Sequence, residues 1–129
     1  MSAARLNDYL EDMMGAAKRA CKFVEGMPKA NFFEDEKTQQ AVAMSFVIIG
    51  EIAAKINEKY GDFVLAHPEI PWDGIRGMRN RIVHAYFAID WQYVWDTLHK
   101  DLPLLVDAIT PHVKPAAKQT APKPPRNVG

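Results

Sequence analysis

The sequence predicts an all-α protein, an antiparallel four-helix bundle whose last helix is kinked. Apolar residues recur at three- and four-residue spacing in four segments, which is the period of helices that bury one face. Capping residues and glycine or proline stops separate these segments, and no stretch alternates as a strand would. With 129 residues and 48% hydrophobic content, the chain suits one domain with a single core.

The first helix is predicted to begin after Ser2, a plausible N-cap, and to stop at the glycine and proline of residues 26–28. The apolar residues on its inward face, here called its stripe, are Leu6, Leu10, Met13, Met14, Ala17, Cys21 and Val24. A loop that contains Phe32 and Phe33 follows.

The second helix is predicted from its cap, Asp35, to about Tyr60, where Gly61 closes it. Its stripe consists of Val42, Phe46, Ile49, Ala53 and Ile56. Glu51 interrupts this apolar segment, either as a solvated flank residue or as a partner for an arginine across the core. Residues 62–71 are expected to be a connector, and His67 a surface histidine, because the following Pro68 disfavours helix there.

The third helix is predicted to begin at Pro71 or Trp72. Its inward residues are expected to be Trp72, Ile75, Met78, Ile82 and Val83. Gly74 and Gly77 weaken a helix by roughly 1 kcal/mol each relative to alanine. Their presence indicates the close approach of another backbone or of a ligand.

Asp90 is expected to cap the fourth helix, and Pro103 to kink or restart it before Pro111. Its apolar side comprises Tyr93, Val94, Trp95, Leu98, Leu102, Leu105, Val106 and Ile109. Trp91 and Trp95 are expected in the core or at a dimer interface. We expect the helical domain to occupy residues 1–111, and residues 112–129, rich in proline and lysine, to form a disordered basic tail.

Composition excludes several classes of function. Sixteen basic and sixteen acidic residues cancel, so no overall field draws the protein to nucleic acid or membrane. A polyanion would therefore have to be held by a local patch. The lone Cys21 excludes an intrachain disulfide and a cysteine-rich metal site. No signal peptide or membrane-length apolar run is visible, so we expect a cytoplasmic protein.

Residues 71–95 concentrate the chemically useful side chains. Three arginines (Arg76, Arg79 and Arg81) lie close to His84 and Tyr86. Positions five apart on a helix point about 140° from each other, so Arg79 and His84 do not share a face. To act on one atom, the helix must end near His84 or a second copy must face it. Asn80 and His84 do share a face.

A neutral imidazole can take the proton from a ribose 2′-hydroxyl or give one to a leaving 5′-oxygen. Arg79 can hold phosphate oxygens through two hydrogen bonds and stabilise the charge that builds on phosphorus. No set of metal ligands with the usual spacing lies near His84, so the residues favour RNA cleavage without metal or cofactor. On spacing alone, a capping histidine beside a solvated arginine explains the pair as well.

The run Ile-Pro-Trp-x-x-Ile-x-Gly-Met-Arg-Asn-x-x-Val-His-x-Tyr, from Ile70 to Tyr86, resembles the HepT-like branch of the HEPN superfamily. Residues 48–51, 94–95 and 101–103 also look like landmarks of that family. The resemblance implies a small helical bundle that dimerises and cuts RNA without metal, as the toxin of a toxin–antitoxin pair. Its antitoxin would be a nucleotidyltransferase of the MntA type.

By position, the resemblance makes Arg79 and His84 the catalytic pair and Asn80 the polar residue after the arginine. Arg76 and Arg81 become candidate RNA contacts. Tyr86 becomes the tyrosine that the antitoxin modifies with AMP, and a tyrosine simply packed at the helix end is the structural alternative. A second function stays open: a non-catalytic helical module that binds a nucleotide or serves a nucleotidyltransferase, with Arg79 and His84 as phosphate contacts.

Overall fold

The computed structural model describes residues 3–114, and all regular structure in this range is helical. The elements are α1 (Ala3–Phe23), α2 (Lys29–Phe32), α3 (Glu36–Lys59), α4 (Gly61–Ala66), α5 (Trp72–His84), the 3₁₀ turn η1 (Tyr86–Ala88), α6 (Trp91–Ile109) and the 3₁₀ turn η2 (Thr110–His112). The predicted all-α class is confirmed. Of the tail predicted at residues 112–129, residues 115–129 lie outside the described residues.

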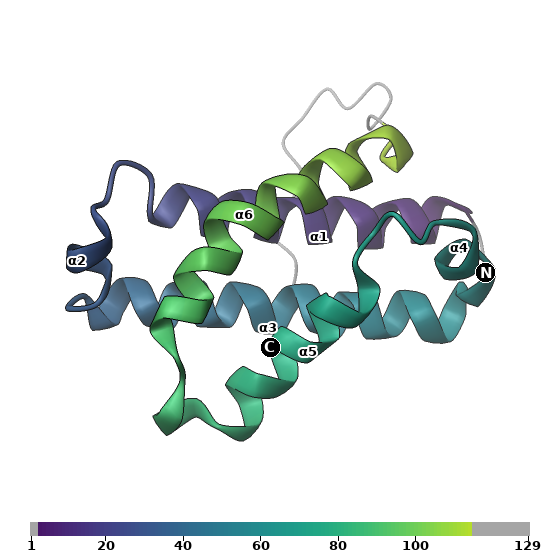
Figure 1. The fold of residues 1–129 in the computed structure, drawn as a ribbon. Helices are drawn as coiled ribbons and strands as arrows, with labels where there is room; N and C mark the ends of the chain where they lie inside the picture. Colours follow the sequence, from purple (N-terminus) through teal and green to yellow (C-terminus); the bar gives the residue numbers. More distant parts are fainter. Residues whose placement is uncertain (1–2, 115–129) are drawn as a thin grey trace.

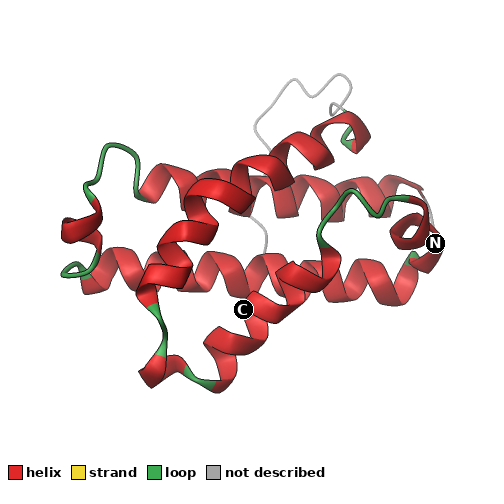
Figure 2. Cartoon of the chain, viewed as in Figure 1, coloured by secondary structure: helices red, strands yellow, loops and turns green. Residues whose placement is uncertain are grey.

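The four long helices form an antiparallel bundle in chain order. In Figure 1, α1 and α3 run side by side in opposite directions, α5 lies obliquely across α3, and α6 returns across α1. Figure 2 shows that short loops join them, with the small helices α2 and α4 at opposite ends of α3. The bundle therefore places α5, which carries Arg79 and His84, and α6 on one side of the α1–α3 pair.

The core is built from the predicted stripes with two exceptions. The most completely buried side chains include Leu10, Met13, Phe32, Val42, Ile49, Ile56, Ile70, Val94, Leu98, Leu105 and Ile109. Val83 and Tyr93, predicted to face inward, are 46% and 42% exposed. Their neighbours Ile82 and Val94 are buried instead. Consecutive residues on a helix point about 100° apart, so Val83 and Tyr93 face away from the core.

Two of the three predicted N-caps, Asp35 and Asp90, are confirmed, whereas Ser2 lies outside the described residues. The Asp35 carboxylate accepts a hydrogen bond from the Thr38 backbone N–H (3.1 Å) and thereby caps α3. The Asp90 side chain accepts from the N–H groups of Gln92 and Tyr93 and caps α6. Gly26, which follows α1, has φ of 73°, a left-handed conformation that glycine adopts without strain.

Two predicted loops contain helices. Phe32 lies in α2, not in a loop, and is completely buried, with its ring packed against Trp91 and Trp95 of α6. This contact explains why both tryptophans are partly buried. The Gln39 side chain donates a hydrogen bond to the Phe32 carbonyl (2.9 Å) and fixes this turn. Residues 62–66, predicted as connector, belong to α4. Both helices are too short for a period to show in the sequence.

The folded part extends past the boundary predicted at residue 111. Val113 packs against the core, and the Lys114 backbone N–H donates to the Asn7 side chain of α1 (2.7 Å). Pro103 lies inside a continuous α6, which bends along its length in Figure 1. The proline removes one helical hydrogen bond, so the predicted kink, not a restart, is the outcome.

By length and composition, α3 is the one helix in residues 3–114 that passes a test for a membrane span. Half of its most apolar 18-residue window is buried against the other helices. The central helix of a globular bundle has these same properties, so the test gives weak support for a membrane location.

Candidate active site at the end of α5

The helix α5 ends at the residue predicted to be catalytic. His84 is its last residue, and Ala85 leaves the helical conformation with φ of −137° while its N–H bonds the Arg81 carbonyl (3.1 Å). The chain then turns through η1 into α6. As a result the His84 ring is exposed at the tip of the molecule, so the first of the two predicted conditions, a helix that ends near His84, is met.

Arg79 is held in place by α3. Its Nε donates to the Glu51 carboxylate (2.7 Å), and its Nη1 donates to the Asn80 side-chain oxygen (3.0 Å). Glu51 thus combines the two alternatives: its side chain is half exposed, and it pairs with an arginine at the surface and not across the core. Guanidinium carries five N–H donors, so further N–H groups on its terminal nitrogens remain for a phosphate.

Gly50 makes this arrangement possible. A Cβ built at Gly50 would lie 2.6 Å from Cγ of Arg79 and closer still to its Cβ, so any larger residue would collide with the arginine stem. The close approach of another backbone predicted at Gly74 and Gly77 is not found: a Cβ at Gly74 would meet only Cβ of Pro71, at 3.9 Å, and the close helix contact lies at Gly50 instead. Nothing in the described chain lies within 4 Å of a Cβ at Gly77.

The two predicted catalytic side chains occupy different surroundings. Arg79 is partly buried in the α3–α5 contact, whereas His84 is exposed. The two residues are five positions apart, which is roughly 7.5 Å along the helix axis. In residues 3–114 no hydrogen bond joins them. They would meet on a substrate laid along the end of α5, or across an interface with a second copy.

The other predicted site residues surround this helix end. Arg76 pairs with the exposed Asp73 one turn earlier (2.7 Å). The Arg81 guanidinium stacks over the Tyr93 ring of α6 at 4.7 Å, which keeps it facing solvent beside η1. Tyr86 is 37% exposed and meets only its neighbour Phe87, edge to face, among aromatic rings of the described chain. An enzyme could therefore reach the Tyr86 ring.

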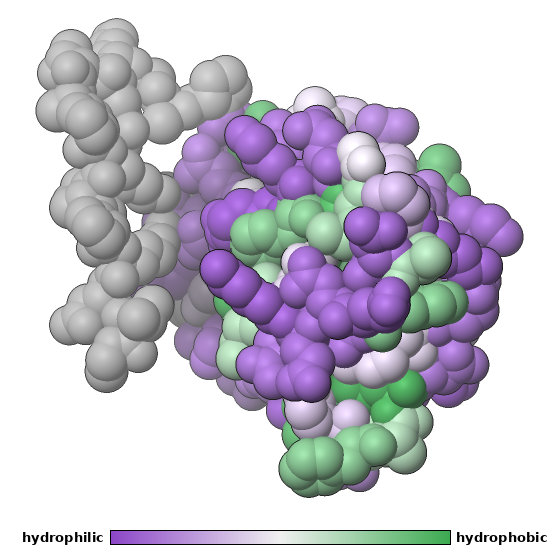
Figure 3. Space-filling model, turned by 90° about the vertical axis from the view of Figure 1, so that its left-hand side faces the viewer, coloured by the Kyte–Doolittle hydropathy of each residue, from purple (hydrophilic) through white to green (hydrophobic). Residues whose placement is uncertain are grey.

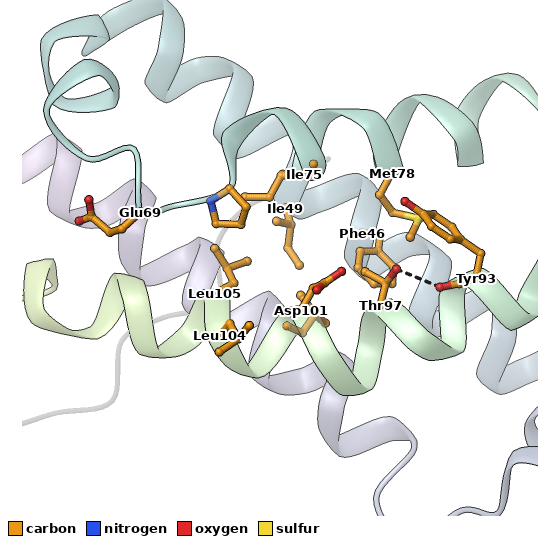
Figure 4. A pocket seen from close by; sticks show the side chains of 13 residues that line it. Phe46, Ile49, Glu69, Ile75, Met78, Tyr93, Thr97, Asp101, Leu104 and Leu105 are labelled. Atoms are coloured by element: carbon orange, nitrogen blue, oxygen red, sulfur yellow. Dashed lines mark hydrogen bonds between the residues drawn. The ribbon is translucent and has the colours of Figure 1, made fainter.

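A cavity of about 230 Å³ lies between α5 and α6 with α3 as its floor, but the predicted catalytic residues do not line it. Figure 4 shows Phe46 and Ile49 behind it, Ile75 and Met78 above, and Leu104 and Leu105 below. The Asp101 carboxylate projects into the gap (Figure 4). An apolar space with a carboxylate does not suit a polyanion, so we do not place RNA there.

One group of potential metal ligands lies elsewhere. His67, Glu69 and His112 gather their ligating atoms within 4.8 Å of one another, before the start of α5 and at η2. This group could not be predicted from local spacing, because His112 lies 43 residues beyond Glu69.

Two residues of the candidate site were given no role in it from the sequence: Gly50, and Glu51, which was considered only as a possible partner for an unspecified arginine. An isolated glycine inside an apolar helical pattern is a signal of close packing, and Gly50 carries that signal. What it packs against could be read only from the fold.

The family model described as "Ribonuclease HepT-like" matches residues 13–111. A protein of Thermococcus cleftensis named "Probable ribonuclease HepT" is 40% identical over 98 residues, which cover 76% of this chain and 86% of that protein. Two proteins of Methanocaldococcus jannaschii are also similar. "Putative RNase MJ0127" is 33% identical over 74% of this chain and 76% of its own length. "Putative RNase MJ1380" is 30% identical over 80% and 92%.

No solved structure matches the chain significantly. The family match nevertheless covers the helices that build the site, from α1 to η2, and includes Gly50, Glu51, Arg79 and His84. The chain belongs to the HepT-like ribonuclease family.

Proposed function

We propose that the protein is a metal-independent endoribonuclease in which His84 transfers protons and Arg79 binds the scissile phosphate. The observation that carries this proposal is the end of α5. It leaves the imidazole exposed at the tip while Glu51 and Asn80 hold the guanidinium on the same helix. Cleavage of a phosphodiester requires a proton-transfer group and a fixed cation that can act on the same phosphate, and the end of α5 carries one of each.

The reaction uses the RNA's own nucleophile. An imidazole takes the proton of the 2′-hydroxyl, and the 2′-oxygen attacks phosphorus. The bond to the 5′-oxygen breaks, and that oxygen leaves with a proton from an imidazolium. The products are a 2′,3′-cyclic phosphate and a 5′-hydroxyl, so the protein need not activate a water molecule. Arg79 stabilises the charge on the non-bridging oxygens in the transition state.

We further propose that the active form is a homodimer with the two α5 ends facing each other. Two copies would supply two His84 rings, one as base and one as acid. The α5–α6 connection suits such an interface, because apolar side chains gather at this end of the molecule (Figure 3, lower edge). Among the exposed residues of this region are Val83, Tyr86 and Phe87, and the Phe87 side chain is completely exposed.

We propose that a partner nucleotidyltransferase of the MntA type silences the enzyme by adding AMP to Tyr86, as in a toxin–antitoxin pair. Tyr86 lies seven residues after Arg79 and two after His84, and its ring is accessible. AMP there would place a phosphate anion and an adenosine next to the groups meant for RNA. The modification would therefore block the site both electrostatically and sterically.

The cleavage proposal is tested on purified protein with RNA in EDTA. Wild-type protein should produce 2′,3′-cyclic phosphate ends. His84→Ala should lower the rate by about 10²- to 10⁴-fold, the contribution of a general acid–base group, while the exposed position keeps the fold intact. His99→Ala on α6 serves as the matched histidine control. Equal cleavage by wild-type and His84→Ala proteins would sink the proposal.

The alternative function, a non-catalytic nucleotide-binding module, predicts a different result from the same protein. Isothermal titration would then show nucleotide binding that depends on Arg79, and no RNA would be cut.

The modification is tested separately, by mass spectrometry of the protein co-expressed with a nucleotidyltransferase encoded beside it. AMP on Tyr86 supports the switch, and an unmodified protein, or AMP on another residue, counts against it.

A further inference from the structure

His67, Glu69 and His112 form a cluster at the opposite end of α5 from His84. His67 and Glu69 belong to the loop between α4 and α5, and His112 lies in η2 after α6. With 13 residues, α5 is roughly 20 Å long, so the cluster and the proposed active site are separated by the length of a helix. The ribonuclease chemistry uses none of these three residues.

The three side chains converge on one carboxylate oxygen. His67 Nδ1 lies 2.9 Å from Glu69 Oε2, and His112 Nε2 lies 3.3 Å from the same oxygen. Zinc bonds of about 2.0–2.1 Å in a tetrahedral site place neighbouring ligand atoms about 3.3 Å apart. The two distances to Glu69 Oε2 are already close to that value, and the two histidine nitrogens lie within 4.8 Å of each other. Side-chain rotations that bring the two nitrogens to tetrahedral spacing would admit an ion between the three atoms.

The cluster is held from several sides. The His67 carbonyl accepts hydrogen bonds from the Trp72 indole N–H (3.1 Å) and the Ile70 N–H (3.2 Å), which fixes the loop. The Phe63 ring packs against both histidine rings, with centroids 4.5 Å and 5.4 Å away. Such packing restricts the ring orientations before a ligand arrives, which lowers the entropic cost of binding.

The ligand chemistry is that of a transition-metal site. Two imidazoles and one carboxylate suit Zn²⁺ and related divalent ions better than Mg²⁺ or Ca²⁺, which take oxygen ligands. The half-exposed Glu69 leaves solvent access for a fourth ligand.

We propose that His67, Glu69 and His112 bind one Zn²⁺ per chain, in a three-ligand site with an open fourth position. The ion would tie η2, at the end of α6, to the loop that starts α5. It would stabilise this end of the bundle, and it would leave cleavage in EDTA possible because the active site lies elsewhere.

The test is isothermal titration of tag-free protein with Zn²⁺, followed by Co²⁺ absorption as a report on ligand geometry. Wild-type protein should bind one ion per chain and melt at higher temperature with Zn²⁺ than with EDTA. His112→Gln and Glu69→Gln should each weaken binding by at least about 100-fold, since even outer partners of metal ligands contribute 10- to 100-fold. His99→Gln is the control and should bind like wild type.

Two outcomes would overturn the proposal. Wild-type protein with no saturable Zn²⁺ binding would leave only a hydrogen-bonded cluster of side chains. Binding that survives both His112→Gln and Glu69→Gln would place the ion on other residues. Circular dichroism in EDTA checks the fold of each variant, and if His112→Gln does not fold, Glu69→Gln carries the same decision. No readout requires RNA, so failure here is independent of the ribonuclease proposal.

Discussion

Glu51 sets the direction of the Arg79 guanidinium, although it touches neither RNA nor the scissile bond in the proposed mechanism. The arginine is the only cation of the candidate site that α3 holds directly. Because half of the Glu51 side chain is exposed, the ion pair adds little to stability, within about 1 kcal/mol. Its value is positional, since a misplaced guanidinium binds the ground state without matching the transition state.

Glu51→Gln is therefore expected to lower the rate of cleavage by about 10- to 100-fold, the cost of small displacements in an active site. The melting temperature should change little. The measurement is kcat and KM on a short RNA, with the effect mainly on kcat. Glu58→Gln, an exposed glutamate on the same helix, is the control. A Glu51→Gln enzyme with full activity would show that Arg79 needs no partner on α3.

At the scale of elements, the contact between α3 and α5 decides whether the site exists. It depends on Gly50, where the stem of Arg79 occupies the space that a side chain would need. The two helices approach through a glycine and an arginine stem, so a change at residue 50 acts on fold and site together.

Gly50→Ala should destabilise the protein by about 1–2 kcal/mol, because overpacking costs about 1–3 kcal/mol and the better helix propensity of alanine returns only part of it. Activity should fall as α5 shifts. Gly77→Ala on α5 is the matched control and should be neutral or stabilising by up to about 1 kcal/mol, since its Cβ meets nothing. Urea denaturation measures both. A Gly50→Ala protein as stable as Gly77→Ala would contradict this account of the contact.

The N-terminus of α3 predicts a dependence on pH. Hydrogen bonds from the Thr38 hydroxyl and backbone N–H lower the pKa of Asp35. A carboxyl whose pKa is lower in the folded state stabilises the fold above its unfolded pKa, about 3.9, and loses this contribution as pH falls through the folded pKa. Asp35→Asn, which caps without titrating, should remove this part of the acid sensitivity. Urea melts at pH 7 and pH 3 of both proteins test it. Identical losses on acidification would show that Asp35 is not the group responsible.

For the whole molecule, the proposed dimer would use the exposed tip of the α5–α6 connection. An exposed phenylalanine costs about 1.5–3 kcal/mol relative to a buried one, and Phe87 lies beside the proposed catalytic residues. A second copy placed there would both bury this surface and complete the pair of imidazoles.

Phe87→Glu is expected to weaken dimerisation by at least about 10-fold, because losing about 1.4 kcal/mol of association energy has that effect. Leu65→Glu, equally apolar and exposed but on α4, is the control and should leave the dimer intact. Sedimentation over a concentration series gives the dissociation constant. A wild-type monomer at micromolar concentration would count against a shared site.

Mixing Arg79→Ala with His84→Ala protein adds a second test, since recovered activity requires groups from opposite chains.

Local patterns were enough to predict much of this fold. The stripes of the four long helices, the caps Asp35 and Asp90 and the kink at Pro103 all depend on residues within a turn or two of each other. Such features are encoded by spacing and by the chemistry of a few side chains. The short α2 and α4 were missed because one turn gives no period, and they form only where Phe32 and Phe63 pack on their neighbours.

The four long helices, the likeness to the HepT-like family and the presence of Arg79 and His84 on one segment could all be predicted from local sequence. The residues that lie beside them in space became known only from the fold. The Glu51–Arg79 contact spans 28 residues and the Glu69–His112 contact spans 43. Both arise from the way whole helices cross, and a crossing is set by the summed packing of many side chains, such as the stem of Arg79 against Gly50. The spacing of residues close together in the sequence therefore does not predict how the helices cross.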